Sequence, residues 1–350
     1  MEMLTFNASD GYLEAMMRGL RASILTASEY NNIMQCETTE DIRMTLNGTD
    51  YAPYLQNEPV PLQTAALVTR LTERIVSDFA GIRSSAYEPL ATFLDYLTYP
   101  YMIDNLVLLI TGALRNRELS DLIDKCHPLG MFEGMGTLSI VATPEELYRD
   151  VIVDTPLASY FVDCVSIQDL SELNIEIIRN LLYKAYLEDF ADLCARRIGG
   201  ITAQVMAPVL GFEAGRRIVN ITLNSLGTDL TKEQRAALFP HVPNSLDAEI
   251  VHLLARADDE PAVAVALDRS PVFRALFQRA ADHPERSLED EFFEHEVKLL
   301  REAFDQQFHY GVFYAYFRLR EQEVRNLVWL AECIAQRQRA HLGKVVNIFG

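Results

Sequence analysis

The sequence lacks the loops that most nucleotide-binding proteins and serine hydrolases need. It has no G-x-x-x-x-G-K-[ST] and no G-x-G-x-x-G segment, whose backbone amides cradle phosphates. It also has no G-x-S-x-G elbow, on which many hydrolases present a serine nucleophile. We therefore expect no cofactor, no catalytic residues and a function other than that of an enzyme.

Paired cysteines and long apolar runs are also missing. The five cysteines are dispersed without a C-x-x-C pair, so a disulfide framework or a zinc site is not expected, although one pair stays open. Apolar runs such as Leu106 to Ile110 fall far short of the about 20 residues of a membrane span. The N-terminus has no signal-peptide pattern. We expect a cytosolic chain whose membrane association, if it has one, comes through a partner.

Basic residues are few. The 31 Lys and Arg residues face 50 Asp and Glu residues, which gives a formal net charge of −19. Such a surface repels nucleic-acid phosphates and anionic lipid head groups, so no nucleic-acid partner is expected. A basic protein partner fits this charge, and solubility alone explains it equally well. The hydrophobic content of 49% is ample for a sizeable core.

Helix signals are what the sequence does contain. Capping patterns begin at Thr143, Thr231 and Ser287, with a weaker capping Ser at Ser28. Apolar residues recur at spacings of three and four over 175–190 and 324–335, as on one face of a helix. One short stretch, Thr137 to Val141, alternates as a strand does. The pattern predicts an all-α protein.

The chain shows no flexible linker, and a weak internal repeat indicates lobes within one body. Breaks are expected at 51–61, 126–136, 239–244 and 283–286. The pattern β-branched, charged, Asn, Leu recurs at Ile103–Leu106, Ile178–Leu181 and Val324–Leu327. Its Asn residues lie 75 and then 146 positions apart, which leaves room for one eroded copy near residue 253.

Two acidic clusters are candidates for metal chemistry. His295-Glu296 begins like a zinc-protease helix, but Leu299 stands where the second His is needed, so a solvated acidic face is the favoured interpretation. Asp258-Asp259 resembles the first magnesium motif of helical prenyl-chain enzymes, but nothing places a second motif opposite it. Its position beside Pro261 favours a helix N-terminus, where acidic residues complement the dipole.

Two other groups of residues are candidates for partner contacts. The pairs Arg196-Arg197 and Arg216-Arg217 stand out in an acidic chain. Internal ion pairs or a solvated position are favoured over contact with an acidic partner helix. The C-terminal third is rich in aromatic residues. Most of these are expected in the core, and a minority at an interface.

A set of longer segments is distinctive enough to compare with known families. These segments are Gly11–Glu14, Arg18–Leu20, Gln35–Thr38, Thr49–Tyr51, Ala86–Leu90, Tyr101–Asn105, Cys126–Gly130, Val153–Leu157, Asn174–Asn180, Leu253–Asp259, Phe292–Lys298, Gln307–Phe313, Arg325-Asn326 and Ala331–Arg337. They resemble the family of subunit d of the vacuolar-type (V-type) proton ATPases, to which the C-type subunit of the archaeal-type ATPases is related. The resemblance runs from residue 11 to residue 337, with departures at the N-terminus, at 131–142 and within 241–285.

This resemblance implies a single all-α domain over 1–350, a funnel of three related lobes near 1–125, 126–238 and 239–350. It implies a non-catalytic, peripheral subunit on the cytoplasmic face of vacuolar or other endomembranes. There it would sit on the proteolipid c-ring, receive stalk subunits D and F, contact the cytoplasmic domain of subunit a, and pass torque from ATP hydrolysis to proton transport. The alternatives are a generic helical adaptor and a helical magnesium enzyme.

Thirteen residues within the matching segments or the repeat are the candidates for partner contact or for fastening the lobes internally, and internal fastening is favoured for the repeat residues. They are Tyr87, Glu88, Tyr101, Asp104, Asn105, Arg179, Asn180, Phe292, His295, Glu296, Phe308, Arg325 and Asn326. The net charge favours an anionic socket for a basic foot of the stalk.

Overall fold

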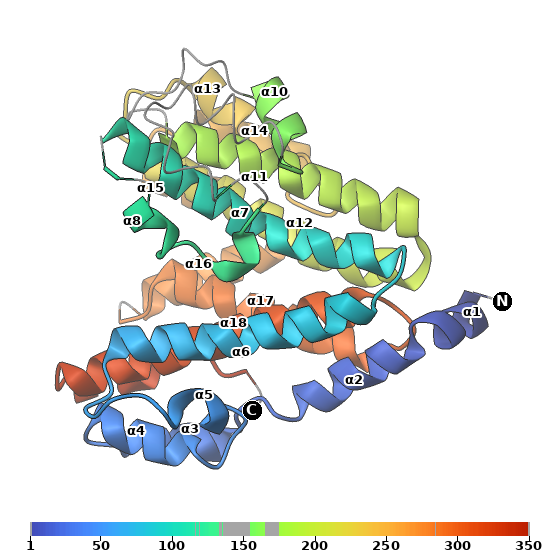
Figure 1. Ribbon diagram of the computed structural model, residues 1–350. Coiled ribbons are helices and arrows are strands. Elements are labelled where there is room, and N and C mark those ends of the chain that lie inside the picture. Colours follow the sequence, from blue (N-terminus) through green and yellow to red (C-terminus); the bar gives the residue numbers. More distant parts are fainter. Residues whose placement is uncertain are drawn as a thin grey trace. The chain divides into compact units, whose positions relative to one another are not determined.

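Helices make up all of the regular structure that is described (Figure 1). The computed structural model describes residues 2–115, 117–118, 120–132, 135, 155–164, 175–283 and 285–348. Over these ranges the structure contains helices and no strand, which confirms the all-α class. The strand-like stretch Thr137 to Val141 and the helix start at Thr143 lie outside the described residues.

The chain divides into two compact units. Unit 1 joins residues 1–91 with residues 271–350, so that both ends of the chain share it, and unit 2 comprises residues 92–270. The three lobes expected from the resemblance stay a prediction.

Unit 1 is built around its last long helix, α18. Helix α18 packs against α2, α4, α6 and α17, and α6 lies alongside it in Figure 1. The helices of this unit are α1 (Glu2–Ser9), α2 (Gly11–Arg21), α3 (Ala27–Met34), α4 (Thr39–Leu46), α5 (Ala52–Leu55), α6 (Thr64–Ser85), α16 (Pro271–Asp282), α17 (Leu288–Glu302), η7 (Ala303–Asp305), α18 (Gly311–Ala335) and η8 (Arg339–Lys344).

Unit 2 contains a long helical hairpin, in which α11 and a π-helical turn lead through Gly199 and Gly200 into α12. Both glycines have positive φ, 73° and 56°, which side-chain-bearing residues rarely adopt. The elements are α7 (Leu90–Leu114), α8 (Ser120–Ile123), η1 (Pro128–Gly130), α10 (Ala158–Cys164), α11 (Ile175–Asp192), η6 (Leu193–Ile198, the π-helical turn), α12 (Gly200–Ser225), α13 (Lys232–Ala237), α14 (Ala248–Arg256) and α15 (Glu260–Leu267).

Most of the helix starts agree with the sequence. Thr231 and Ser287 each form a complete capping box, and Asp259 accepts a hydrogen bond from the amide of Ala262 at the start of α15, so these predictions are confirmed. The prediction of a cap at Ser28 is wrong. Thr26 caps α3 instead, because Glu29 lies at its third helical position and completes a capping box.

Helix α7 is long and apolar enough to cross a membrane by length and composition, the one such helix among the described residues. A core helix passes the same test, and α7 has the contacts of one. Phe93 and Tyr96 pack on Phe190 of α11 at ring-centroid distances of 5.4 Å. Asn105, near its middle, is buried and hydrogen-bonded.

The core of unit 1 holds a buried ion pair on α18. The side chains of Arg320 and Glu323 are fully buried, and their charged groups lie 2.5 Å apart. Arg320 also donates to the hydroxyl of Tyr316 at 3.0 Å and to the carbonyl of Ser23, which follows α2. The guanidinium therefore joins α18 to the turn between α2 and α3.

The carboxylate of Glu323 also accepts hydrogen bonds from two residues outside α18. Its carboxylate accepts the backbone amide of Leu25 at 2.5 Å and the hydroxyl of Tyr51, which precedes α5, at 2.6 Å. Burial, followed by the charge of Glu323, raises the pKa of Tyr51 well above its usual value, so this hydroxyl keeps its proton and donates. Every hydrogen-bonding partner a buried carboxylate needs is thus supplied by the chain.

The pair extends to α6 through Tyr316. The hydroxyl of Tyr316 donates to Asp78 at 2.7 Å, and Arg74 donates to the same carboxylate at 3.0 Å. Burial raises the pKa of Tyr316 as well, so it too stays neutral. One network therefore connects α18 with α6, with the start of α5 and with the α2–α3 turn.

Removing one charge of this pair should destabilise the protein strongly. Arg320→Met leaves the carboxylate of Glu323 buried without its counter-charge, which costs about 3–5 kcal/mol of unfolding free energy. The double variant R320M/E323Q removes both charges and should be more stable than R320M alone. Urea denaturation followed by helical circular dichroism measures both. An R320M protein within about 1 kcal/mol of the native one would contradict the central place of the pair.

Candidate interaction site

The candidate residues fall in both units. Tyr101, Asp104, Asn105, Arg179 and Asn180 lie in unit 2, and the other candidates lie in unit 1. For the candidates of each unit, the contacts show which side chains are bonded within the protein and which are exposed.

Asn105 of α7 clamps the backbone of a segment that follows it in the chain. Its amide nitrogen donates to the carbonyl of His127 at 3.0 Å, and its amide oxygen accepts the N–H of the same residue at 2.7 Å. Only 3% of Asn105 is exposed. A carboxamide has one donor and one acceptor group, so it can bond both the C=O and the N–H of a single residue. Here it bonds both backbone groups of His127.

Asn326 of α18 makes the same clamp in unit 1. It donates to the carbonyl of Val346 at 2.7 Å and accepts the N–H of Val346 at 3.1 Å, and it is also 3% exposed. Each Asn lies fifteen residues after the first and nine before the last residue of a 25-residue helix. The clamped residue follows 22 positions later in unit 2 and 20 positions later in unit 1. In two copies of the sequence repeat, the Asn therefore has the same role: it binds both backbone groups of one residue in the segment that follows its helix.

The third copy found in the sequence differs. Asn180 stands near the start of α11 and donates to the carbonyl of Glu176 in its own helix at 2.8 Å. Helix α12 carries a related pattern, Ile218-Val219-Asn220-Ile221, which the repeat pattern missed because Val219 replaces the charged residue and Ile221 replaces the Leu. Asn220 stands 115 residues after Asn105 and 106 residues before Asn326, a more even spacing.

Tyr101 supports the Asn105 clamp from one turn earlier. Its ring stacks on His127 with centroids 4.0 Å apart and planes at 11°. A Cβ at Gly130 would lie 2.5 Å from the Tyr101 backbone, so only glycine allows this close approach. Burial lowers the pKa of His127 to about 4. The imidazole is therefore neutral near pH 7 and its Nδ1 accepts the amide of Leu129 at 3.2 Å.

The remaining unit 2 candidates form an ion pair between helices. Arg179 of α11 donates to Asp104 of α7 at 2.9 Å, and its second contact, with Glu176, is longer at 4.0 Å. The side chains of Arg179 and Asp104 are 42% and 45% exposed. Such an exposed pair contributes about 0–1 kcal/mol, so it can exchange for a partner at little cost.

In unit 1, several candidates join α17 to α18. Arg318 donates twice to one carboxylate oxygen of Glu296, at 2.9 and 3.0 Å, and Glu296 is only 8% exposed. The guanidinium of Arg325 stands 3.8 Å above the ring of Phe293. Phe292 is 1% exposed and packs on Phe273 of α16. These side chains fasten α17 to its neighbours.

His295 is half-buried on α17. Burial, together with the charges of Lys298 and Arg279, lowers its pKa below the usual value. The acidic residues beside it have partners of their own: Glu291 pairs with Arg279 at 2.6 Å. No cluster of three or more His, Cys, Asp or Glu side chains within the described ranges could hold a metal ion. Asp258, the other metal candidate, pairs with Lys232.

Phe308 links the end of η7 to the N-terminal helices. Its backbone has φ of 65°, and its N–H lies 3.1 and 3.2 Å from the two carboxylate oxygens of Glu14. The ring meets Phe6 edge-on with centroids 6.3 Å apart. Arg18 completes the site by donating to Glu14 and to the carbonyl of Phe304. Sequence reasoning named Phe308 but missed Glu14 as its partner.

Tyr87 and Glu88 are exposed candidates in unit 1. They stand between α6 and α7, and 82% of Tyr87 is exposed. Glu88 is also exposed. A large aromatic side chain with this exposure, next to a carboxylate, has the composition of an interface anchor.

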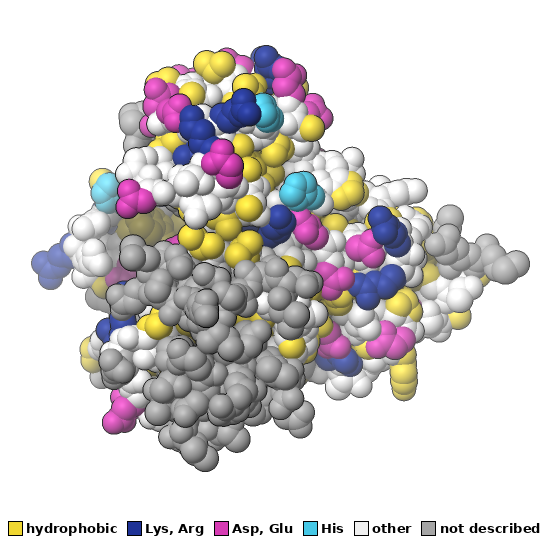
Figure 2. All heavy atoms as spheres, turned by 90° about the horizontal axis from the view of Figure 1, so that it is seen from above, with side chains coloured by type: hydrophobic (Ala, Val, Ile, Leu, Met, Phe, Trp, Pro, Cys, Tyr) yellow, Lys and Arg dark blue, Asp and Glu magenta, His cyan; other side chains and the backbone are white. Residues whose placement is uncertain are grey.

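The excess of acid does not collect into a single patch on the face seen in Figure 2. Basic and acidic side chains lie beside one another there, with apolar atoms between them. Ion pairs such as Arg286 with Glu294 and Arg70 with Glu58 show the same interleaving. On this face, therefore, the net charge alone does not mark an anionic socket.

The two Asn clamps can be tested against Asn180. Asn105→Leu and Asn326→Leu each leave a buried N–H and a buried C=O without partners, which should cost about 2–4 kcal/mol of unfolding free energy. Asn180→Leu, the matched control, removes one hydrogen bond within a helix and should cost about 1 kcal/mol or less. Urea denaturation midpoints give the comparison. Equal losses in all three variants would refute the clamp assignment.

His127 should make stability depend on pH. Its folded pKa of about 4 lies below the unfolded value of 6.5, so the unfolded chain binds more protons between these values. The contribution is fully present above pH 6.5, and up to about 3 kcal/mol is lost as pH falls toward 4. His127→Asn keeps a side-chain acceptor and should lose less stability over this window. A stability difference between the two proteins that is constant from pH 7 to pH 4 would contradict this assignment.

Comparison with known proteins adds evidence that the contacts alone do not supply. The sequence matches the family described as ATP synthase (C/AC39) subunit over residues 13–344. It is 49% identical over 349 residues to V-type proton ATPase subunit d2 of Arabidopsis thaliana, covering 99% of each chain. It is 49% identical over 348 residues to V-type proton ATPase subunit d of Dictyostelium discoideum, covering 99% of this chain and 97% of that relative. The V-type proton ATPase subunit d of Saccharomyces cerevisiae is 39% identical over 352 residues, covering 100% of both chains.

Proposed function

Because this chain belongs to the ATP synthase (C/AC39) subunit family, we propose that it is a non-catalytic subunit of a V-type proton ATPase and couples the rotary stalk to the membrane ring. The observation that carries the proposal is the match along nearly the whole chain to relatives that are named subunit d of this enzyme. The match covers 99% of this chain for the Arabidopsis thaliana relative and 100% for the Saccharomyces cerevisiae relative.

A coupling subunit has to be stiff, and the internal contacts of this chain support such a role. Close-packed helices resist deformation, and the buried Arg320–Glu323 pair and the two Asn clamps hold helices to loops with directional hydrogen bonds. We place the protein at the cytoplasmic face of vacuolar or other endomembranes as a peripheral subunit. Its partners would be the proteolipid c-ring, stalk subunits D and F, and the cytoplasmic domain of subunit a. Each of these is an expectation from the family.

The contacts divide the candidate residues between two roles. Asn105, Asn326, Glu296 and Phe292 are buried and hold the fold together. Tyr87, which is largely exposed, suits contact with a partner subunit. For the stalk, we propose that a local group of carboxylates receives a basic helical foot. Reversing those charges should then change stalk binding and its dependence on salt.

Recovery of partners from membranes tests the proposed function. The tagged chain, purified in mild detergent, should bring down proteolipid ring subunits together with stalk subunits D and F. A chain that recovers none of them would refute the coupling role and favour a helical adaptor outside the ATPase.

A pair of variants sharpens this experiment. Tyr87→Ser should lower the yield of recovered partners about tenfold, because an aromatic anchor at an interface contributes more than about 1.4 kcal/mol. Val60→Ser is the matched control, since Val60 is 69% exposed in the same unit and is not a candidate. Unchanged recovery with Tyr87→Ser would remove Tyr87 from the interface.

A further inference from the structure

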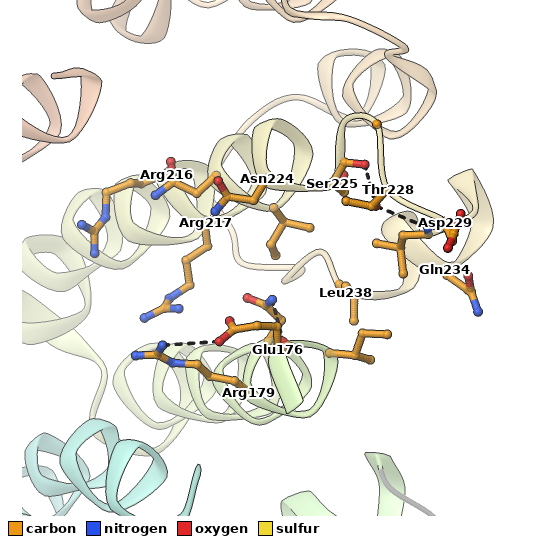
Figure 3. Close-up of a pocket in the computed structure, with 16 residues that line it drawn as sticks. Glu176, Arg179, Arg216, Arg217, Asn224, Ser225, Thr228, Asp229, Gln234 and Leu238 are labelled. Carbon is orange, nitrogen blue, oxygen red and sulfur yellow. Dashed lines mark hydrogen bonds and ion pairs between the residues drawn. The ribbon is translucent and has the colours of Figure 1, made fainter. Parts of the chain in front are cut away.

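The arginines that line a cavity between α11 and α12 in unit 2 are paired within the chain. The cavity has a volume of about 970 Å³, and Figure 3 shows these arginines among the residues that line it. Arg179 forms an ion pair with Asp104 at 2.9 Å, and Arg216 and Arg217 both pair with Glu213, at 2.7 and 2.9 Å. Their charges are therefore matched, and they do not call for a ligand.

Unit 1 begins with two helices whose outward side is uncharged. Residues 4–22, here called the N-terminal arm, span α1 and α2, which follow one another in Figure 1. The backbone N–H of Asp10 donates to the carbonyl of Phe6 at 2.8 Å, and that of Glu14 donates to the carbonyl of Asp10 at 2.9 Å. This helical bonding pattern is kept across the junction, so residues of α1 and α2 share faces as on one helix.

The two carboxylates of the N-terminal arm are buried against the rest of unit 1. Asp10 and Glu14 are 5% and 4% exposed. Asp10 accepts the hydroxyl of Tyr310 at 3.0 Å, and Glu14 accepts the backbone N–H of Phe308 at 3.1 Å. Neither carboxylate faces outward.

The two arginines of the N-terminal arm are bonded inward as well. Arg18 donates to Glu14 at 2.6 Å and to the carbonyl of Phe304 at 2.8 Å. The guanidinium of Arg21 lies 4.5 Å from the centre of the Phe304 ring. Together with Asp10 and Glu14, these are all the charged residues between positions 4 and 22, so the charge of the arm is bonded within unit 1.

The outward side of the N-terminal arm carries exposed apolar residues. Leu4 is 77% exposed and Tyr12 is 74% exposed, which places them among the most exposed large hydrophobic side chains in the described part of the chain. Small exposed residues continue the same spacing of three and four: Ala8, Ala15, Gly19 and Ala22. On a helix this spacing makes one stripe, here called the outward stripe. A surface helix normally has the reverse arrangement, with its charges toward water.

Gly19 shows that the outward stripe has room for another chain. A Cβ at this position would meet no described atom within 4 Å, and Gly19 does not have the positive φ that favours glycine. Glycine within a helix is less stable than alanine, and no described contact of this chain requires it here. A helix of another protein that crosses the stripe at this point would need the space that a side chain would fill.

Charge and size decide which occupant fits the outward stripe. A charged segment would lose its hydration there without gaining a counter-charge. An anionic lipid surface calls for Lys or Arg beside the apolar residues, but Arg18 and Arg21 are bonded inward. The stripe is about 30 Å long and about 10 Å wide, or about 300 Å², and a stable dimer buries about 800 Å² per partner. A second copy of the chain would therefore not be held by it alone.

We propose that the outward stripe binds the uncharged, apolar face of an α-helix from a partner subunit. Leu4 and Tyr12 pack against that helix, and the small residues let the two backbones approach closely. The contact is one part of a larger interface, because about 300 Å² alone is too small for stable binding. The proposal rests on the proposed function, since it takes the partner to be a subunit of the same complex.

Photo-cross-linking from the N-terminal arm in the membrane-bound complex tests this proposal. The aromatic photo-cross-linking residue p-benzoylphenylalanine replaces Tyr12 in the full tagged chain, which is irradiated on membranes and then purified in mild detergent. Mass spectrometry of the adduct should identify a segment of a partner subunit with apolar residues at spacings of three and four and no charge among them. The matched control site is Met44, which is 57% exposed on α4 and should give no adduct with that segment.

A variant at Gly19 separates docking from folding. Gly19→Leu fills the outward stripe but favours the helix, so the fold should be at least as stable as the native one. The adduct yield at position 12 should fall about tenfold, or about 1.4 kcal/mol. The matched control is Gly81→Leu on α6, where a Cβ also meets no described atom within 4 Å, and it should change the yield less than about twofold. Equal yields from G19L and the native background would overturn the proposal.

Each of the other occupants would give a different adduct and would overturn the proposal. These adducts are with a second copy of the chain, with lipid alone, or with a segment rich in charged residues. A chain that is recovered with its partner subunits but forms no adduct at position 12 would also overturn it, and would leave the proposed function standing. A chain recovered without any partner subunit would refute the proposed function itself and this proposal with it.

Discussion

The buried pair of Arg320 and Glu323 is the interaction on which unit 1 depends. Two charges without exposed atoms persist only because their neighbours supply every partner: Ser23, Leu25, Tyr51 and Tyr316. The hydrogen-bonding partners of the pair come from both parts of unit 1, residues 1–91 and residues 271–350. The pair therefore fixes the positions of the α2–α3 turn and of Tyr51 against α18. The Asn326 clamp and the Arg318–Glu296 pair lie on the same helix and rely on its position.

Much of the fold could be predicted from the sequence, because helix caps and apolar spacing depend only on residues a few positions apart. The starts at Thr231 and Ser287 were predictable for this reason. The start of α3 was misplaced, because Ser28 and Thr26 are both competent caps and only Glu29 decides between them. The buried network was not predictable: in a helix with several arginines, nothing in the spacing says which one faces inward.

The candidate site shows the same division between local and long-range information. The pattern around Asn105 and Asn326 identified two equivalent clamps, although their partners, His127 and Val346, are set by the path of the chain after each helix. Asn180 matches the pattern at all four positions but lies elsewhere on its helix. Asn220 was overlooked because Val219 and Ile221, on either side of it, depart from the pattern. The pair Arg216-Arg217, for which internal pairing or solvation was favoured, forms ion pairs with Glu213 of the same helix.

Its family and its relatives indicate that this chain is a non-catalytic subunit of a V-type proton ATPase. The most direct test is ATP-driven acidification of membrane vesicles from cells that lack the chain, measured with and without its restoration. On the proposed coupling role, we expect that acidification is lost without the chain and returns with it. Acidification at the normal rate in vesicles without the chain would contradict the account.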